Sequence, residues 1–568
     1  MSYMGRKVFV SVLGVGFYGE CIYKRGDFES EKTRFIQQAT LEMLTNNDSW
    51  TAEDQGYILL TEGARVNNWV VDGNVRINKA TNSEETYLGL KETIHEMNLP
   101  FAVEGINIPV GNNEDEIWQI FDMVFGKLQD GDELYFDITH GFRYLPMLVL
   151  VLGNYAKFLK RVTVRSITYG NFESADKALC PPVAPIIDIT SFSALQDWTI
   201  AASDFLNHGD ATRLASCGTD QLKSILRETK GKDVAAANLN VLCKSIGDFS
   251  DSVRFCRGIE LYEGKASSRV VASLLNDRGE YLKPLMPLLH KVGDYLNGFE
   301  KGRAENIILA SDICIKSGNW QAAITLLQEG VVTFFCARHN LEIDDHKQRM
   351  IVNKAFKKKQ LWYNGKVTSY EPLSKDEEKM VDEVVNDDML TFGLALDFQN
   401  LVDVRNDINH AGMRNNKAPM KIKNLKDNIE KCLNHILECI NEPLQTSSRL
   451  FLNLSNHPSS KWSKEQLDAA AEFGKIVDMP FPAVDPDCSS DIIENEAEML
   501  VREIKSHALC KKVVVHVMGE MGLTYCIVKK LSAIGIRCVC STSYRIVKEE
   551  DEGKRLVEFH FNKFRDYE

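Results

Sequence analysis

The chain has 568 residues, of which 44% are hydrophobic and 26% are charged. This length predicts several domains, and the composition is that of a soluble globular protein and excludes a largely disordered chain. The net charge of −13 argues against a constitutive binder of duplex DNA, because phosphate neutralisation needs a clustered basic face. An RNA substrate that visits one local basic site remains compatible with this charge.

Targeting and redox signals favour a cytoplasmic protein. No apolar run is long enough to span a bilayer, and the apolar N-terminus lacks a small-residue cleavage site, so it predicts a buried first strand. The 14 cysteines are scattered without a Cys-x-x-Cys pair, which favours reduced thiols. We therefore expect no membrane contact and no metal site.

Residues 1–190 alternate between strand-like and helix-like runs. The predicted strands are Lys7–Leu13, Tyr57–Thr61, Ala102–Ile108, Glu133–Thr139 and Val162–Tyr169, and the predicted helices are Glu31–Leu44, Glu84–Met97, Glu114–Leu128 and Tyr144–Leu159. This alternation predicts a Rossmann-like α/β domain with a parallel sheet covered on both faces. The proline-rich stretch Cys180–Pro185 is interpreted as its boundary.

Residues 191–447 are predicted to form an all-helical domain. Nearly every apolar run there has helical spacing, including Ala304–Ile315, Trp320–Phe335, Lys379–Val385, Leu394–Val404 and Leu425–Ile440.

Residues 448–568 return to an α/β rhythm after a predicted linker at Asn441–Ser448, and are expected to form a small third domain. We predict strands at Arg449–Leu454, Val513–Met518 and Arg537–Thr542, helices at Lys464–Phe473, Ile492–His507 and Leu523–Ile534, and a final hairpin of Tyr544–Val547 and Leu556–Phe561 with Glu550–Gly553 as its turn.

Two glycine-bearing loops follow predicted strands of the first domain. Gly14, Gly16 and Gly19 match the letters of a dinucleotide fingerprint, but no helix opens inside the motif and no acidic residue ends the next strand. A different phosphate-bearing ligand therefore fits this loop better than a nicotinamide cofactor.

The second loop contains Asp137, Thr139, His140, Gly141 and Arg143. Thr139 is expected to cap the following helix, and Gly141 lets backbone N–H groups approach an anion, with His140 and Arg143 as further donors. A plain turn with a structural Asp–Arg pair is the alternative. Both loops should lie at the carboxyl edge of the sheet, where open α/β sheets bind ligands. The same edge should carry Glu62 and Ala64 after the second strand, and Tyr169 and Gly170 after the fifth.

In the helical domain, candidate chemistry concentrates at Arg405, Asn406 and His410. RNA cleavage without a metal needs a base for the ribose 2′-hydroxyl and a cation for the phosphorane, and His410 and Arg405 suit these roles, with Asn406 orienting either. Five residues place Arg405 and His410 about 140° apart on an ideal helix. They converge only if the helix ends between them, which Ala411 and Gly412 favour, or if two copies face each other across a dimer.

The sequence DITHGFR resembles the Asp-x-Thr-His-Gly signature of CRISPR-associated CARF proteins, and RNDINH resembles the Arg-Asn-x-x-x-His motif of HEPN ribonucleases. Their order and spacing resemble CARF–HEPN accessory ribonucleases of type III CRISPR systems, over about residues 1–447. This resemblance implies a homodimer, or a higher homo-oligomer, that binds a cyclic oligoadenylate at paired CARF domains. It also implies that paired HEPN domains cut single-stranded RNA in antiviral defence without a metal, leaving 2′,3′-cyclic phosphates.

Carried over by position, the resemblance assigns activator binding to Gly14, Gly16, Phe17, Thr61, Glu62, Thr139, His140, Gly141 and Arg143, and catalysis to Arg405, Asn406 and His410. Cyclic tetra-adenylate is the preferred activator and the hexamer the second. No other cofactor is implied.

Polar residues and a glycine also follow the strands of the third domain, namely Ser455, Asn456, His457, His516, Gly519, Glu520, Thr542 and Arg545. This part resembles small Rossmann-like CRISPR-associated proteins, which implies a ring nuclease that degrades the activator. Alternatively, the domain is a second nucleotide-binding or dimerisation module, in which His516 is a satisfied strand histidine.

Two rival functions remain for the whole chain. One is a ligand-sensing regulatory protein that binds nucleic acid, but we find no helix-turn-helix with a basic recognition helix in residues 191–447. The other is a nicotinamide oxidoreductase, which the missing acidic partner of the glycine loop disfavours.

Overall fold

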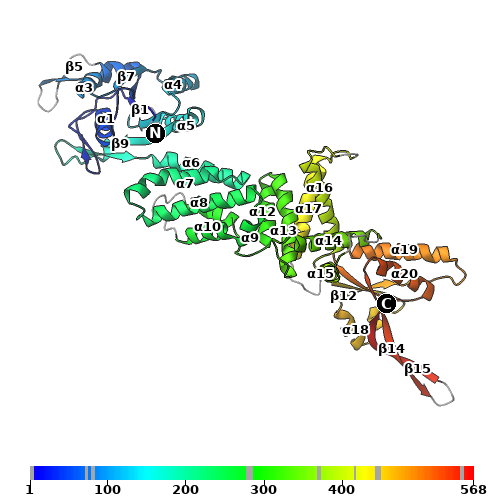
Figure 1. The fold of residues 1–568 in the computed structure, drawn as a ribbon. Coiled ribbons are helices and arrows are strands. Elements are labelled where there is room, and N and C mark those ends of the chain that lie inside the picture. The colour runs from blue at the N-terminus through cyan, green and yellow to red at the C-terminus, as the bar shows by residue number, and fades with distance from the viewer. Residues whose placement is uncertain are drawn as a thin grey trace. The chain divides into compact units, whose positions relative to one another are not determined.

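A computed structural model describes residues 5–70, 74–77, 83–141, 143–276, 286–366, 373–414, 417–441, 449–549 and 555–567. The chain divides into two compact units, Met1–Ile200 and Ala201–Glu568 (Figure 1). The first unit is an α/β domain, and the second contains a helical region followed by a smaller α/β domain. The predicted fold class is therefore confirmed. No helix among the described residues has the length and apolarity needed to cross a membrane.

The first unit is built on a mixed sheet of strand order β3-β2-β10-β9-β8-β1-β4-β7. The five predicted strands form its parallel part, β9-β8-β1-β4-β7. The bounds are β1 (Lys7–Leu13), β2 (Ile22–Arg25), β3 (Phe28–Glu29), β4 (Gln55–Leu60), β7 (Ala102–Asn107), β8 (Glu133–Asp137), β9 (Thr163–Gly170) and β10 (Val183–Asp188), and a separate pair is β5 (Asn74–Ile77) with β6 (Glu84–Tyr87).

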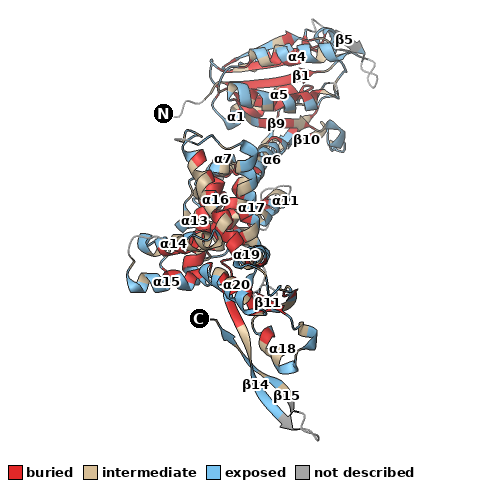
Figure 2. Cartoon of the chain, turned by 90° about the vertical axis from the view of Figure 1, so that its right-hand side faces the viewer, coloured by how far each residue is buried: buried red, intermediate tan, exposed pale blue. Residues whose placement is uncertain are grey.

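Helices cover both faces of this sheet, as predicted. Strand β1 is buried throughout (Figure 2), with Phe9 and Leu13 packing on the side of α1 and α3, and Val8 and Val10 on the side of α4 and α5. The helical elements are α1 (Ile36–Asn47), α2 (Glu62–Ala64), η1 (Arg65–Trp69), α3 (Leu90–Glu96), α4 (Glu114–Lys127), α5 (Leu145–Lys160), η2 (Phe172–Ser174) and α6 (Ser191–His208). A strand buried on both faces explains the continuous apolar run of β1.

Two predictions for this unit were wrong. The helix expected at Glu84–Met97 is split into strand β6 and helix α3, because β6 pairs with β5 and Gly89 precedes the first helical turn. The stretch Cys180–Pro185, interpreted as a boundary, enters the sheet, because β10 pairs antiparallel with β9 and parallel with β2. The pairing of β10 with β2 joins distant segments, which local spacing does not reveal.

The helical region contains α7 (Thr212–Glu228), α8 (Val234–Arg254), α9 (Gly258–Glu263), α10 (Lys265–Asn276), α11 (Met286–Tyr295), α12 (Glu305–Lys316), α13 (Trp320–Arg338), α14 (His346–Tyr363), α15 (Lys375–Val385), α16 (Phe392–Asn409) and α17 (Ile422–Asn441). All five predicted helical runs are confirmed. The last six helices share a core in which Phe335, Phe356 and Phe398 pack with their rings in tilted or edge-on contact.

The C-terminal sheet has the order β12-β11-β13-β14-β15, and its first four strands are parallel. Its elements are β11 (Arg449–Ser455), η5 (Ser459–Lys461), α18 (Lys464–Ala471), β12 (Lys475–Pro480), α19 (Ser490–His507), β13 (Lys512–Met518), α20 (Met521–Ala533), β14 (Arg537–Glu549) and β15 (Arg555–Asp566). Helix α18 covers one face, and α19 and α20 cover the other.

Two details of this domain differ from expectation, and two predicted segments lie outside the described residues. Strand β12 was not predicted, and β14 runs without a break through both segments expected there. The linker residues 442–448 and the hairpin turn 550–553 lie outside the described residues.

Within the second unit, the helical region and the C-terminal sheet share side-chain and backbone contacts. Phe392, the first residue of α16, belongs to the core of the C-terminal domain, and the amide of Gly393 donates to the carbonyl of Leu509 at 2.7 Å. Asp388 accepts from Lys512 at 2.6 Å and also pairs with Arg449. Helix α16 therefore begins in contact with the C-terminal domain.

Candidate functional site

The loop after β1 is held in place by an asparagine that sequence reasoning missed. Asn68 is 1% exposed, and its Nδ2 donates to the carbonyls of Gly14 and Gly16, each at 2.8 Å. A side chain at Gly14 would place its Cβ 2.3 Å from the Tyr18 hydroxyl. The glycine therefore serves close packing of the loop, and the two carbonyls are occupied within the protein.

The loop after β8 is built on a buried carboxylate. Asp137 accepts from the hydroxyl of Ser11 at 2.6 Å and from the amide of Thr139 at 3.1 Å, and burial raises the pKa of Asp137. The hydroxyl of Thr139 accepts from the amide of Gly170 at 2.7 Å, which ties this loop to the end of β9. These bonds tie the loop to β1 through the Ser11 side chain and to β9 through the Gly170 backbone.

Thr139 is not the helix cap that we predicted. Helix α5 begins at Leu145, and its N-cap residue is Tyr144, whose side chain makes no capping bond. Gly141 has φ +122°, and a Cβ there would lie 2.4 Å from Leu145, so the turn between strand and helix needs glycine. A loop therefore separates the end of β8 at Asp137 from the start of α5 at Leu145. Arg143 in this loop is exposed.

His140 packs against Tyr18, with ring centroids 4.1 Å apart and an interplanar angle of 20°. Burial lowers the pKa of His140 to about 4, so the ring is neutral at pH 7. Its buried Nε2 makes no hydrogen bond among the described residues. This nitrogen is one polar atom that a ligand could satisfy.

The remaining predicted residues of the first unit lie at the same edge. Thr61 and Glu62 follow β4, the neighbour of β1, and the Thr61 hydroxyl accepts from the amide of Ala64 at 3.3 Å. Phe17 is half-exposed and packs edge-on against Tyr87, with the Arg34 guanidinium 4.1 Å from its ring. The carboxyl ends of β8, β1 and β4 thus bring together the residues that the sequence placed there.

In the helical region, α16 ends where the candidate cleavage motif lies. Arg405 and Asn406 are in its last turns, and His410 is the C-cap residue, whose amide donates to the carbonyl of Asn406 at 3.1 Å. Ala411 and Gly412 have φ of 51° and 73°, which is the left-handed conformation of a helix end. The predicted helix end is confirmed, while the catalytic role of the motif stays a proposal.

The side chains of this motif differ in exposure. The Arg405 guanidinium is half-buried and donates to Gln328 Oε1 of α13 at 3.3 Å, whereas His410 is exposed. The segment that follows carries five basic residues and no acidic one, namely Arg414, Lys417, Lys421, Lys423 and Lys426, of which all four lysines are exposed. An otherwise acidic chain therefore has a local basic surface next to His410.

The polar residues of the C-terminal domain converge on Asn453, which was not among the predicted site residues. Its Oδ1 accepts from Ser455 Oγ at 2.7 Å and lies 2.8 Å from His516 Nδ1, and its Nδ2 donates to the carbonyl of His457 at 2.9 Å. Asn453 also donates to Asp478 of β12 at 2.7 Å. The predicted residues Ser455, His457 and His516 are therefore connected by one hydrogen-bond network.

His516 lies in the interior of this domain. It is 1% exposed, stacks near Phe451, and its Nε2 is 3.2 Å from Ser541 Oγ. Burial, followed by the nearby His457, lowers the pKa of His516 to about 4. Both ring nitrogens are used within the protein, whereas His457 and its neighbour Asn456 are exposed.

Five predicted residues of this domain, namely the exposed Asn456 and four others, do not join the network. The Glu520 carboxylate caps α20 by accepting from the amides of Gly522 and Leu523 at 2.8 and 2.7 Å. Thr542 donates to the carbonyl of Lys563 at 2.9 Å, and exposed Arg545 lies farther along β14. Gly519 packs beneath the ring of Phe481. A Cβ added at Gly519 would lie 2.4 Å from this ring.

Asn68, Tyr18 and Asn453 were missed because each acts through a contact distant in sequence. Asn453 carried a weak signal, since a polar residue within an apolar strand requires a buried partner. Within the described ranges, no three His, Cys, Asp or Glu side chains lie together as metal ligands would.

The low pKa of His140 predicts a pH dependence of stability. The unfolded chain binds a proton at this residue below about pH 6.5, whereas the folded protein does so only near pH 4. The unfolded state therefore binds more protons between these values, and the free energy of unfolding should fall as the pH is lowered from 6.5 to 4.

His140→Phe, which retains an aromatic ring against Tyr18 but cannot titrate, should reduce this pH-dependent loss. Urea unfolding at pH 7, 5.5 and 4.5 measures the effect, with His346→Phe as the exposed control. An identical pH dependence in wild type and His140→Phe would contradict the assignment.

Two family models match the chain. Residues 8–173 match "CRISPR system endoribonuclease Csx1, CARF domain", and residues 449–565 match "Uncharacterized protein MJ1673 family". A curated relative, the CRISPR-associated protein MJ1674 of Methanocaldococcus jannaschii, is 25% identical over 371 residues, which cover 59% of this chain and 55% of that protein. The match thus spans about half the length of this relative.

Among solved structures, Enterococcus italicus Csm6 bound to cyclic hexa-2'-fluoro-hexa-dAMP is similar with a TM-score of 0.34 and 11% identity, covering 77% of this chain and 93% of that one. The family match and the sheet that carries the two glycine loops together show that the first unit contains a CARF domain of the CRISPR Csx1 family. The C-terminal sheet is a domain of the MJ1673 family.

Proposed function

We propose that this chain is an endoribonuclease of type III CRISPR defence, which a cyclic oligoadenylate activates to cut single-stranded RNA without a metal. The observation that carries the proposal is the end of α16, where exposed His410 follows Arg405 and Asn406 and precedes a basic segment. The CARF match of the first unit supports activation by a nucleotide ligand.

The proposed reaction is an attack of the ribose 2′-oxygen on the adjacent phosphorus. His410 takes the 2′-hydroxyl proton, the Arg405 guanidinium stabilises the charge of the phosphorane, and Asn406 orients the groups. The 5′-oxygen leaves with a proton, so the products carry a 2′,3′-cyclic phosphate and a 5′-hydroxyl. Lysines that follow the motif, such as Lys417 and Lys421, supply local positive charge for the RNA backbone.

Two copies of the chain would complete this site. An exposed apolar stripe on α5, formed by Met147, Val151, Tyr155 and Phe158, supports a dimer through the CARF domains. These residues recur at intervals of three or four, so they share one face of the helix. The same helix follows the loop of His140, which links the proposed activator site to the proposed subunit contact.

The activator would bind at the carboxyl ends of β8, β1 and β4. Exposed Arg143 supplies a cation for phosphate, and His140 supplies a neutral ring whose Nε2 has no hydrogen-bond partner in the described part of the chain. Cyclic tetra-adenylate is our first choice and the hexamer the second. Activation then requires that the ligand binds the competent dimer more tightly than the idle one.

One prediction of this proposal concerns the cleavage motif. His410→Ala should lower activator-stimulated cleavage of single-stranded RNA by about 100-fold or more, because it removes the proposed base. The assay uses labelled RNA, EDTA and cyclic oligoadenylates of several ring sizes, and activator binding should be unchanged. His346→Ala, an exposed histidine far from the motif in sequence, is the matched control. Cleavage at the wild-type rate in His410→Ala, or cleavage abolished by EDTA, would refute the proposal.

A second prediction concerns the apolar stripe. Phe158 is 77% exposed, and Phe158→Asp should place a charge in the proposed contact, which weakens the dimer and lowers activated RNA cleavage in parallel. Sedimentation velocity measures the dimer. Phe255→Asp, at a residue that is 69% exposed in the helical region, is the control. A dimer of unchanged stability in Phe158→Asp would exclude this stripe as the contact.

Cleavage of the activator by the C-terminal domain is a second candidate function. It is favoured by the exposed His457, whose backbone is held by Asn453 and Ser455 at the carboxyl end of β11. We assign proton transfer to His457, and a positioning role to His516, because both nitrogens of the buried His516 ring are already used.

Variants of these two histidines should have different effects. His457→Ala should abolish linearisation of cyclic tetra-adenylate with a loss of stability below about 1 kcal/mol, as for most surface residues. His516→Ala should lower the free energy of unfolding by about 2–4 kcal/mol, because it leaves a cavity and a broken network. Chromatography of the activator and urea unfolding provide the two readouts. Full linearisation by His457→Ala would exclude this assignment.

A further inference from the structure

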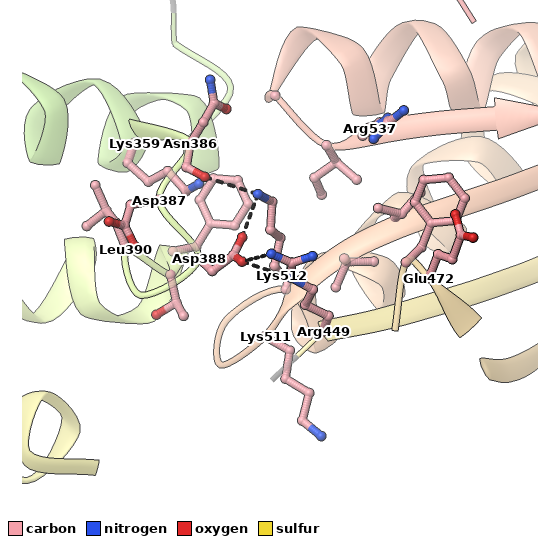
Figure 3. A pocket seen from close by; sticks show the side chains of 18 residues that line it. Lys359, Asn386, Asp387, Asp388, Leu390, Arg449, Glu472, Lys511, Lys512 and Arg537 are labelled. Carbon is pink, nitrogen blue, oxygen red and sulfur yellow. Dashed lines mark hydrogen bonds and ion pairs between the residues drawn. The ribbon is translucent and has the colours of Figure 1, made fainter. Parts of the chain in front are cut away.

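A cavity of about 300 Å³ lies where the helical region meets the C-terminal sheet within the second unit (Figure 3). One wall comes from α14, the loop before α16 and the start of α16. The other comes from Arg449, Lys512 and Arg537, which begin β11, β13 and β14. The cavity therefore lies at the amino ends of these parallel strands, at the opposite edge from the network of Asn453.

Basic side chains outnumber acidic ones around this cavity. The lining includes five cationic residues (Lys359, Arg449, Lys511, Lys512 and Arg537) and three acidic ones (Asp387, Asp388 and Glu472), an excess of two positive charges. The whole chain, by contrast, has a net charge of −13. This local excess marks the cavity as a place for an anion.

The ion pairs leave the cations undercompensated. Asp388 alone serves both Arg449 and Lys512 (Figure 3). Asp387 is engaged outside the cavity lining, by Arg338 at 2.6 Å and His339 at 2.8 Å. Arg537 is also engaged outside the lining, by Asp566 at 2.6 Å. The excess of positive charge therefore lies at Arg449 and Lys512, which share one carboxylate, and at Lys359.

Lys359 forms no ion pair with a carboxylate among the described residues. Its Nζ donates to the carbonyl of Val385 at 2.9 Å, which is a neutral acceptor, and lies 4.9 Å from the centre of the Phe392 ring. Burial, followed by the charge of Lys512, lowers the pKa of Lys359 to about 8, although Asp388 and Asp387 oppose the shift. An anion beside Lys359 would lower the cost of holding this charge.

The cavity also offers apolar walls. Phe392 and Phe473 line it, together with aliphatic residues such as Val513 and Ile536. Its volume is at the lower end of the range of small-molecule sites. Cations beside aromatic walls suit a phosphate group attached to a planar apolar group better than a bare inorganic ion.

We propose that this cavity binds a small phosphate ester of mononucleotide size, held by Lys359 and Lys512 and joining the helical region to the C-terminal sheet. Bound there, the ester contacts the start of α16, which runs 18 residues to the motif at His410, a length of about 27 Å. Control of RNA cleavage from this cavity rests on the proposed function, whereas binding itself does not.

Calorimetric titration of the full chain with AMP and with inorganic phosphate tests the proposal. AMP should bind, and Lys359→Met should weaken its binding about 10-fold or more, because a charge-assisted contact is lost while the length of the side chain is kept. Lys357→Met, on the same helix but outside the cavity lining, should bind AMP as wild type does. Lys512→Met is the second variant, for the case that Lys359→Met does not fold, and it should also weaken the binding of AMP.

The outcomes separate this site from the N-terminal loops and from the proposed nuclease. AMP affinity lost in Arg143→Ala but kept in Lys359→Met and Lys512→Met would overturn the proposal, as would the absence of AMP binding. Equal affinity for inorganic phosphate and AMP would overturn the role of the aromatic walls. Lys359→Met should retain cyclic oligoadenylate binding. A failure of the AMP proposal therefore does not affect the test of His410, which measures RNA cleavage.

Discussion

The termination of helix α16 is the constraint on which the arrangement of the second unit depends. The left-handed residues Ala411 and Gly412 stop the helix immediately after His410, so that the imidazole lies beyond the last turn and Arg405 within the helix. At its other end, Phe392 is buried in the core of the C-terminal domain. One helix thus carries the candidate cleavage residues and also joins the helical core to the second sheet.

The two α/β domains use buried polar side chains in similar ways to shape a sheet edge. Asp137 in the first sheet and Asn453 in the second lie within apolar strands and collect hydrogen bonds from neighbouring strands. A buried polar group is costly unless its bonds are satisfied, so each fixes the loop that follows it in one conformation. The exposed His457, whose carbonyl accepts from Asn453, is therefore held on a rigid support.

The buried histidines show why residue type alone does not assign a role. His140 and His516 both have lowered pKa values because both are buried, but their hydrogen bonding differs. His516 uses both ring nitrogens within the domain, which suits support of a neighbouring group, whereas His140 retains one nitrogen without a partner among the described residues. A histidine in a sequence motif can thus contact a ligand itself or position the residue that contacts it.

The sequence by itself determined the α/β–helical–α/β order, the parallel strands such as β1 and β8, and the helix end beside His410. These features follow from local periodicity, from glycine and from the turn signal after α16, which act over a few residues. Only the tertiary structure decided the pairing of β10, the network around Asn453 and the cationic cavity with Lys359. Each of these joins segments far apart in the chain, and the energy of such contacts depends on burial and partners that no local pattern encodes.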